Sequence, residues 1–265
     1  MTRMLARAVL AAAVLLTAAC IFPFPWPDID PAETRGEAFV RVVPLEPGGT
    51  IQLDNDLGDI DIRGWDRPEV EITAENEEDV SFRGRIWLPG RRLAAPEVDV
   101  QIEGQIVRIR ARLPERERDI RAVRFTLSVP KSVNLDGIRG REGDVTIADL
   151  YGRARIEMGR GQVRIENYSG ALEVTLGRGS VEAEVLDLRP DDRLRISAAD
   201  GDIALALSPD AAALIQAAAG EAIATEFDLG RTAGEKKIEA RLGGEPGAAI
   251  VLSAPRGGIR ILKSK

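Results

Sequence analysis

Apolar and polar residues alternate along most of this chain, and the alternation restarts at regular intervals. In the centre of the chain a glycine returns every nine residues: Gly143, Gly152, Gly161, Gly170 and Gly179. The positions two and four after each glycine are apolar, and those between them are mostly polar or charged. A period of two is typical of a strand with one buried face, whereas an amphipathic helix spaces its apolar residues three and four apart. The pattern therefore predicts short strands, each begun by a glycine.

A longer period is superimposed on the first. The segment Met158–Val163 returns as Leu176–Val181, which is a shift of eighteen residues. This indicates a coil of two nine-residue half-turns, whose strands would stack in parallel about 4.8 Å apart. We expect an all-β chain that forms a single elongated β-solenoid.

The alternation continues on both sides of the centre. Further strands begin after Gly58, Gly201 and Gly258, and a hairpin is expected about Gly104. The segment Ser208–Ala219 is ambiguous, because Ser208-Pro209-Asp210 before a run of alanines is typical of a helix start. The apolar residues leading to Gly220 favour a strand instead.

The first residues have the features of an export signal. Arg3 and Arg7 precede a short apolar run, Ala8–Ala19, and small residues lead to Cys20. The run is too short for a stable membrane span. Residues 1–19 are therefore interpreted as a helical signal peptide. The alternatives are an uncleaved N-terminal anchor and a signal cut by the ordinary peptidase.

The residues before the cysteine carry a resemblance of their own. Leu16-Thr17-Ala18-Ala19-Cys20 resembles a bacterial lipobox, which implies that Cys20 is acylated and attaches the mature chain to a membrane. Ile21 stands where some inner-membrane lipoproteins carry aspartate, so the same resemblance favours the outer membrane, on its periplasmic or surface face.

Residues 20–36 contain alternate prolines, which favour an extended tether. Residues 37–265 are expected to form the β-domain.

A single cysteine cannot form an internal disulfide, so packing alone must stabilise this domain. Loss of the signal removes two of 36 basic residues and none of 43 acidic ones, and the mature net charge is 34 − 43 = −9. This acidity argues against nucleic acid as a partner.

Candidate catalytic chemistry is restricted by the absence of histidine. No Ser-His-Asp triad or histidine-ligated zinc can form. Carboxylates remain, and the densest cluster is Asp54, Asp56, Asp59 and Asp61. They could bind calcium or act on a sugar. More simply, Asp54 and Asp56 would belong to a turn, and Asp59 and Asp61 would lie on the solvent-exposed face of a strand.

Calcium-binding nonapeptide repeats need aspartate where this chain has Val145, Val163 and Val181. No catalytic, cofactor or metal site is predicted.

Two further groups could bind a glycan. Arg153, Arg155, Arg164 and Arg178 could form a basic stripe for an acidic glycan, although pairing with glutamates on neighbouring strands is favoured: Glu157, Glu166, Glu173 and Glu182. Tyr151, Tyr168 and Trp65 could stack on sugars, although packing at turns is the simpler interpretation.

Several of these segments together resemble a known family. The segments Gly58–Arg67, Val129-Pro130, Gly143-Asp144-Val145 and Gly258–Ile261 are similar to the putative-adhesin β-strand-repeat family of bacterial envelope proteins. The resemblance covers roughly Val40 to Lys263. It implies a β-solenoid-like domain and brings no catalytic residues with it.

The leading hypothesis is a non-enzymatic lipoprotein of the cell envelope, acting as a structural, adhesion or interaction module. Its expected partners are the membrane, through the N-terminal lipid, and an envelope protein or glycan. The alternatives are a carboxylate-dependent glycan-active enzyme and a sensor or scaffold in envelope-stress signalling.

Overall fold

The computed structural model describes residues 38–77, 96–112, 122–229, 235–244 and 247–264, and within these ranges it contains eighteen strands and no helix. The prediction of an all-β fold is confirmed for these residues. The described residues all belong to one unit, Gly36–Lys265. The predicted signal peptide, Cys20 and the proline-rich tether lie outside the described residues. No helix long and apolar enough to cross a membrane occurs in the described ranges.

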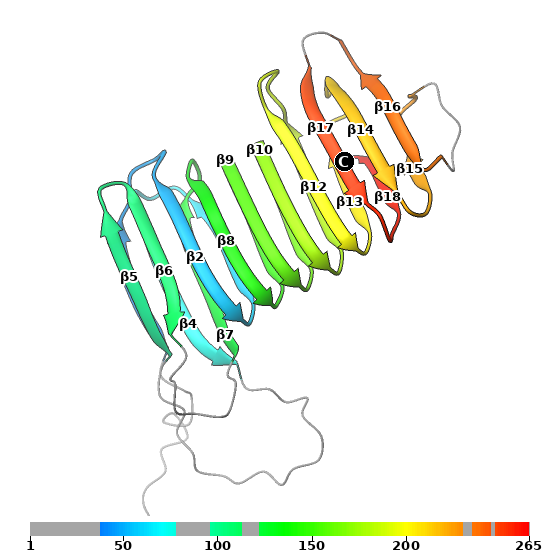
Figure 1. Cartoon of the computed structure of the whole chain (residues 1–265). Coiled ribbons are helices and arrows are strands. Elements are labelled where there is room, and N and C mark those ends of the chain that lie inside the picture. The colour runs from blue at the N-terminus through cyan, green and yellow to red at the C-terminus, as the bar shows by residue number, and fades with distance from the viewer. Residues whose placement is uncertain (1–37, 78–95, 113–121, 230–234, 245–246, 265) are drawn as a thin grey trace, which may run out of the picture. The chain divides into compact units, whose positions relative to one another are not determined.

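The strands form two hydrogen-bonded ladders that share two long strands (Figure 1). The first ladder runs, in spatial order, through β5 (Glu97–Glu103), β6 (Ile106–Arg112), β2 (Thr50–Leu57), β8 (Asn134–Glu142), β9 (Val145–Arg160), β10 (Val163–Arg178), β12 (Arg193–Asp200), β17 (Ala248–Ala254), β14 (Ala213–Ala219) and β16 (Lys237–Leu242).

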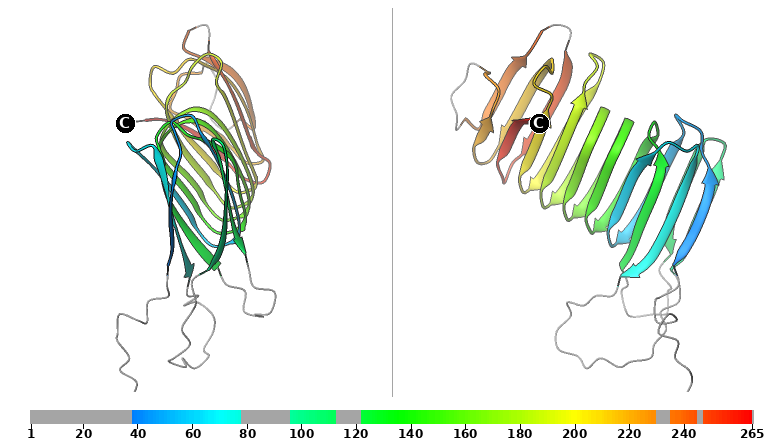
Figure 2. Two further views of the ribbon diagram at one scale, coloured as in Figure 1. Left: turned by 90° about the vertical axis from the view of Figure 1, so that its left-hand side faces the viewer. Right: turned by 180° about the vertical axis from the view of Figure 1, so that it is seen from behind.

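The second ladder, seen from behind in Figure 2, runs through β1 (Phe39–Pro44), β4 (Glu69–Glu77), β7 (Ala122–Pro130), β3 (Ile60–Trp65), β9, β10, β11 (Val181–Asp187), β13 (Ile203–Leu207), β18 (Ile259–Lys263) and β15 (Ile223–Thr225). The apolar sides of both ladders contribute to one continuous core.

The eighteen-residue period sets the register of the centre. Val163 lies beside Val145, and Leu176 beside Met158, in a parallel pairing that extends along β9 and β10. The inward positions expected from the sequence are buried along both strands, for example Ile147 and Ile165 at 0% and 1% exposure. The predicted parallel stacking and the inward face are therefore confirmed.

The glycines have two roles, and in one of them the structure differs from the sequence prediction. Gly143, Gly161 and Gly179 lie in turns ahead of strands, as predicted, but Gly152 and Gly170 lie inside β9 and β10. Each of these sixteen-residue strands passes from one ladder to the other without ending.

The bend within each long strand begins three residues before its glycine. Asp149 and Asn167 have positive φ angles of 60° and 49°, a region that short polar side chains tolerate better than other residues do. The Asn167 side chain donates a hydrogen bond of 3.0 Å to Asp149 Oδ1. This hydrogen bond therefore joins the bend of β10 to the bend of β9.

The turn glycines form a column in which backbones meet directly. A Cβ at Gly143 would overlap the carbonyl oxygen of Gly58, and one at Gly161 would overlap that of Gly143. The same relation holds between Gly179 and Gly161, and between Gly201 and Gly179. At the end of the column Gly257 stacks on Gly201, while Gly258 has its nearest contact at 3.3 Å. The φ angles of the first five glycines, from +111° to +149°, also favour glycine.

Both ends of the ladders are completed by strands that are remote in sequence. β2 lies between β6 and β8, and β3 lies between β7 and β9. At the other end β17 lies between β12 and β14, and β18 lies between β13 and β15. The outlying glycine-led segments thus dock onto the central repeat. Beyond them antiparallel pairs occur, such as β14 with β16.

Two local predictions are confirmed here. β5 and β6 form the expected antiparallel hairpin about Gly104. The ambiguous segment Ser208–Ala219 ends in a strand, β14, after a turn closed by a hydrogen bond from Ala211 N to Ser208 O.

The glycine column predicts a position-specific loss of stability. We expect Gly179→Ala to lower the free energy of unfolding by at least about 1–3 kcal/mol, from the backbone conformation alone, because its φ is +128° and its Cβ would overlap Gly161 O. Gly104→Asn is the control, since that site has φ +59° and open space. Urea unfolding of both variants gives the comparison, and equal midpoints would contradict the column's role.

The inward face predicts a second contrast, between neighbouring residues on β10. Ile165→Asp is expected to unfold the chain, because a charge replaces a side chain worth about 1.5–3 kcal/mol of burial. Arg164→Glu is expected to cost less than about 1 kcal/mol, since the residue is exposed. Thermal melts followed by far-UV circular dichroism test both, and unchanged midpoints for both would show the assigned face to be wrong.

Candidate functional site

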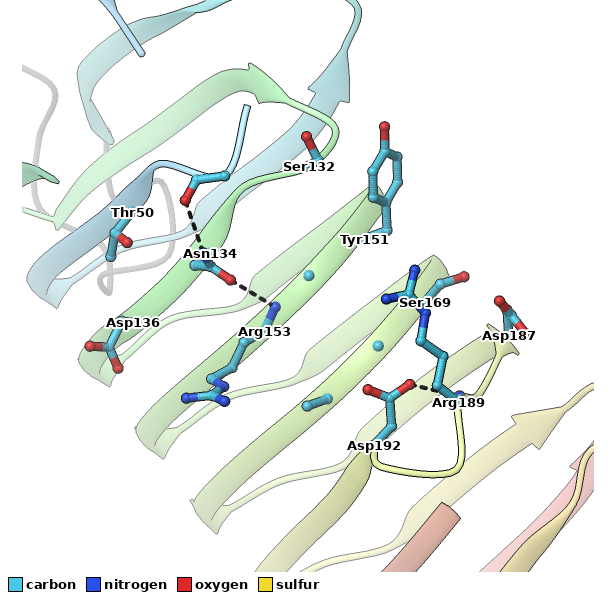
Figure 3. A pocket seen from close by; sticks show the side chains of 14 residues that line it. Thr50, Ser132, Asn134, Asp136, Tyr151, Arg153, Ser169, Asp187, Arg189 and Asp192 are labelled. Atoms are coloured by element: carbon cyan, nitrogen blue, oxygen red, sulfur yellow. Dashed lines mark hydrogen bonds between the residues drawn. The ribbon is translucent and has the colours of Figure 1, made fainter. Parts of the chain in front are cut away.

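A groove of about 650 Å³ crosses the strands where β9 and β10 bend from one ladder to the other (Figure 3). Its floor is formed by backbone at Gly152 and Gly170. One side carries Ser132 and Asn134, and the other carries the loop that contains Arg189 and Asp192. Figure 3 shows Tyr151 at the upper rim and Arg153 at the lower rim. We call this surface the corner groove.

The floor is open because the stacking of the bends requires glycine. A Cβ at Gly170 would overlap the carbonyl oxygen of Gly152, and a Cβ at Gly152 would approach Val133 O. Their φ angles are +117° and +148°. Close backbone contact between turns thus removes side chains from the site at which the groove forms.

The second wall of the groove is an addition to the repeat. Val163 lies beside Val181, an offset of 18 residues, but Leu172 lies beside Leu194, an offset of 22. The chain between β11 and β12 is therefore 22 − 18 = 4 residues longer than the repeat requires. The extra residues form a turn in which Asp192 N donates to Arg189 O at 3.0 Å, and Arg189 N donates to Asp192 Oδ2 at 2.8 Å. The wall is therefore internally ordered.

The polar groups of the groove divide into structural and available ones. Asn134 is structural, because its Nδ2 donates to Gly48 O at 3.1 Å and its Oδ1 accepts from Arg153 N at 3.2 Å. The guanidinium groups of Arg153 and Arg189 form no ion pair within the described part of the chain. Asp136, Asp187 and Asp192 supply carboxylates. With two arginines and three aspartates, the groove has a net charge of 2 − 3 = −1.

Tyr168 lies beneath the floor, on the core side. It is 1% exposed, and its hydroxyl lies 2.9 Å from Gly152 O and 2.8 Å from Ala171 O. Burial raises the pKa of this hydroxyl well above its ordinary value of 10.0, and the carboxylate of Asp192 acts in the same direction. Tyr168 is therefore a support for the floor and is out of reach of a sugar.

The other two aromatic candidates are placed differently. Tyr151 is 51% exposed, so its ring is free to stack on a ligand. Trp65 donates from Nε1 to Glu69 O at 2.9 Å and carries the Arg67 guanidinium 4.8 Å from its ring centroid. Trp65 thus packs at a turn, as the simpler interpretation expected.

The predicted basic stripe is largely neutralised between strands. Ion pairs one turn apart join Arg155 to Glu173 at 3.2 Å and Arg164 to Glu182 at 3.3 Å. Arg178 pairs with Asp200, and Glu157 with Arg139, each at 3.3 Å. Cross-strand pairing is therefore correct for these residues, although Arg178 pairs with an aspartate and Glu157 with an arginine outside the predicted stripe. Arg153 is the member of the stripe that faces the groove.

The four aspartates are dispersed along β2, β3 and the turn between them. Asp54 lies in β2 and forms an ion pair of 3.0 Å with Arg110, and Asp59 forms one of 3.1 Å with Arg124. Asp59 Oδ1 also accepts from Asp144 N at 2.9 Å. Asp54 and Asp56 are thus on strand β2 and Asp59 is in the turn, the reverse of what was expected, whereas Asp61 lies on strand β3 as expected. Among the described residues no group of three acidic, cysteine or histidine side chains could hold a metal ion.

Sequence reasoning missed several residues that hold the bends and turns of the frame. Asp149 and Asn167 mark the bends and recur eighteen residues apart, so the period itself could have identified them. Asn55 is 2% exposed and donates from Nδ2 to Gly58 O and Val123 O, at 3.1 and 2.8 Å. No pattern distinguishes Asn55 or Asn134 before the fold is known, because their partners are distant in sequence.

No protein-family model matches this chain, and no curated protein sequence matches it. Among solved structures it is similar to a putative cell adhesion protein from Clostridium sporogenes, with 11% identity and a TM-score of 0.45, covering 86% of this chain and 100% of that one.

A putative adhesin from Bacteroides fragilis has 12% identity and a TM-score of 0.28, covering 86% of this chain and 99% of that one. A putative lipid binding protein from Parabacteroides distasonis has 11% identity and a TM-score of 0.32, covering 86% and 95%. The names of the first two structures refer to adhesion. At these TM-scores the likeness transfers no function to this chain.

The buried hydroxyl predicts a pH dependence. A tyrosine whose pKa is raised on folding contributes stability that is complete below the unfolded value of about 10 and is lost as pH rises above it, by up to about 1.4 kcal/mol per pH unit. We expect Tyr168→Phe to cost about 1–2 kcal/mol at pH 7, because the one O–H donor shared by the carbonyls of Gly152 and Ala171 is lost. Between pH 10 and 11 the free energy of unfolding of this variant should fall less steeply than that of the wild type. Urea unfolding at several pH values measures both effects.

The matched control is Tyr151→Phe, whose hydroxyl belongs to an exposed side chain. It should follow the wild type over the same pH range. If Tyr168→Phe also followed the wild type above pH 10, the hydroxyl would not be buried as described.

Proposed function

We propose that this protein is a non-enzymatic interaction module of the bacterial cell envelope, built as a β-solenoid and attached to a membrane through acylated Cys20. The observation that carries the proposal is the eighteen-residue register, which stacks parallel strands into two ladders around one core. Such an architecture presents outward side chains at regular intervals on a rigid frame. A frame of this kind suits recognition of an extended partner.

The outer faces support a binding role more than a catalytic one. Arginine and acidic side chains on them are engaged with each other one turn apart, as in Arg155 with Glu173. Asp54 and Asp59, which belong to the densest carboxylate cluster, are held by Arg110 and Arg124. Glycoside hydrolysis needs a pair of carboxyl groups directed at the glycosidic bond, whereas Asp54 and Asp59 are each engaged by an arginine side chain.

The membrane attachment rests on the sequence. The basic start, the short apolar run and the small residues before Cys20 support export followed by acylation. The outer membrane is the favoured location. Since the tether of residues 20–36 is rich in proline, it would hold the β-domain away from the lipid.

Crosslinking with mass spectrometry in intact cells tests the proposal, using the full chain and the Cys20→Ala variant. We expect the mature N-terminal peptide to begin at Cys20 with the mass of added acyl chains, and crosslinks to an envelope protein or glycan. The variant should lose the acyl mass and leave the membrane fraction. An N-terminus at another residue would refute the lipid anchor.

Enzymatic activity is tested separately with cell-wall and capsular polysaccharides. We expect no depolymerisation by the wild type. Depolymerisation that Asp59→Asn abolishes would replace the proposal with the glycan-active enzyme. Crosslinks only to envelope-stress signalling proteins would support the sensor or scaffold instead.

A further inference from the structure

The corner groove has the dimensions of a site for a linear oligomer. A row of lining residues crosses neighbouring strands, from Thr50 on β2 through Asn134 on β8 and Arg153 on β9 to Ala171 on β10. Successive strands lie about 4.8 Å apart, so these three steps span about 14 Å before the loop wall is reached. A single sugar or a metal ion would fill only part of this length.

Charge and polarity limit the chemical class of the ligand. An apolar chain would leave the guanidinium groups of Arg153 and Arg189 and the carboxylates of Asp136 and Asp187 without partners. A polyanion would meet three carboxylates against two arginines, in a chain whose net charge is −7. A neutral ligand rich in hydroxyl groups satisfies both kinds of residue, because a hydroxyl donates to carboxylates and accepts from guanidinium groups.

Besides these charged groups, the groove offers a ligand one exposed aromatic ring. Tyr151 is 51% exposed at the rim, and its backbone N–H donates to Lys131 O at 2.9 Å, which fixes the position from which the ring projects. An exposed ring offers an apolar face to the C–H side of a sugar while its hydroxyl stays hydrated. In Figure 3 the Arg189 side chain extends from the loop toward the strand end that carries Ser169.

We propose that the corner groove binds a linear, uncharged oligosaccharide, with Tyr151 as the stacking platform and Arg153 and Arg189 as hydrogen-bond donors. The proposal specifies a ligand for the binding role proposed above, and it does not depend on acylation of Cys20. Tyr168 and Asn134 act only as supports, because their polar atoms are already engaged with the protein.

The test is isothermal titration calorimetry of the full chain with three neutral hexamers: those of β-1,4-linked glucose, N-acetylglucosamine and mannose. We expect at least one hexamer to bind, and Tyr151→Ala and Arg153→Gln each to weaken it about tenfold, the equivalent of 1.4 kcal/mol. Leu214→Ala and Arg141→Gln are the matched controls, since both residues are exposed and lie outside the groove. The controls should bind as the wild type does.

A loop deletion tests the groove while leaving the pairing of the ladder strands in place. Removing Arg189–Asp192 together with Leu188→Gly restores the 18-residue offset and places a glycine in line with Gly152 and Gly170. We expect this variant to keep the thermal midpoint of the wild type within a few degrees and to lose hexamer binding. Retained binding would overturn the assignment of the loop as a wall of the site.

Three results would overturn the proposal. They are binding of none of the hexamers, binding that Tyr151→Ala and Arg153→Gln leave unchanged, and tighter binding of polygalacturonate through these same residues. Since the titration uses purified protein, these results are independent of the crosslinking and N-terminal mass in cells. Failure of one proposal can therefore be told from failure of the other.

Discussion

The structure depends on how closely the backbones of successive turns approach at the glycine column. From Gly58 through Gly143, Gly161 and Gly179 to Gly201, each glycine Cα lies against the carbonyl group of the glycine before it, leaving no space for a side chain. Hydrogen bonds between the turns, such as those from Gly161 N to Arg178 O and from Val163 N to Ser180 O, run beside these contacts. The spacing of the turns is thus set by the backbone, and the apolar side chains pack within a frame of fixed pitch.

The same requirement explains how much could be predicted from the sequence. Regular glycines and a period of two are local signals, so the strands of the centre, their inward face and the eighteen-residue offset followed from them. The bends at Asp149 and Asn167 were missed. The alternation does break there, since Ile165 and Tyr168 are buried three residues apart, but an irregular spacing does not specify a positive φ angle. The ion pair of Asp54 with Arg110 joins residues 56 apart on β2 and β6, strands whose adjacency no repeat indicates.

The candidate site was harder to predict than the fold, for a physical reason. Tyr151 and Arg153 were visible as residue types, but the groove between them exists only because Gly152 and Gly170 stack and four extra residues rise beside them. The eighteen-residue repeat thus builds the ladders, whereas the four residues by which the chain departs from this repeat build a wall of the groove. Side chains on such a loop can vary without altering the core, because the loop contributes only its backbone to the ladder, through Asp192 O, which accepts from Ala249 N at 3.2 Å.

The order of the strands after β12 has a consequence for the order of folding. β17 and β18 follow β14 and β15 in the sequence, yet β17 lies between β12 and β14, and β18 lies between β13 and β15. While the chain is being synthesised or exported, β14 and β16 can pair with each other but cannot join the central turns until Ala248–Lys263 has emerged. Strands β17 and β18 therefore join the C-terminal strands to the central ones. A chain interrupted before Ala248 would leave the edges of β12 and β13 unpaired.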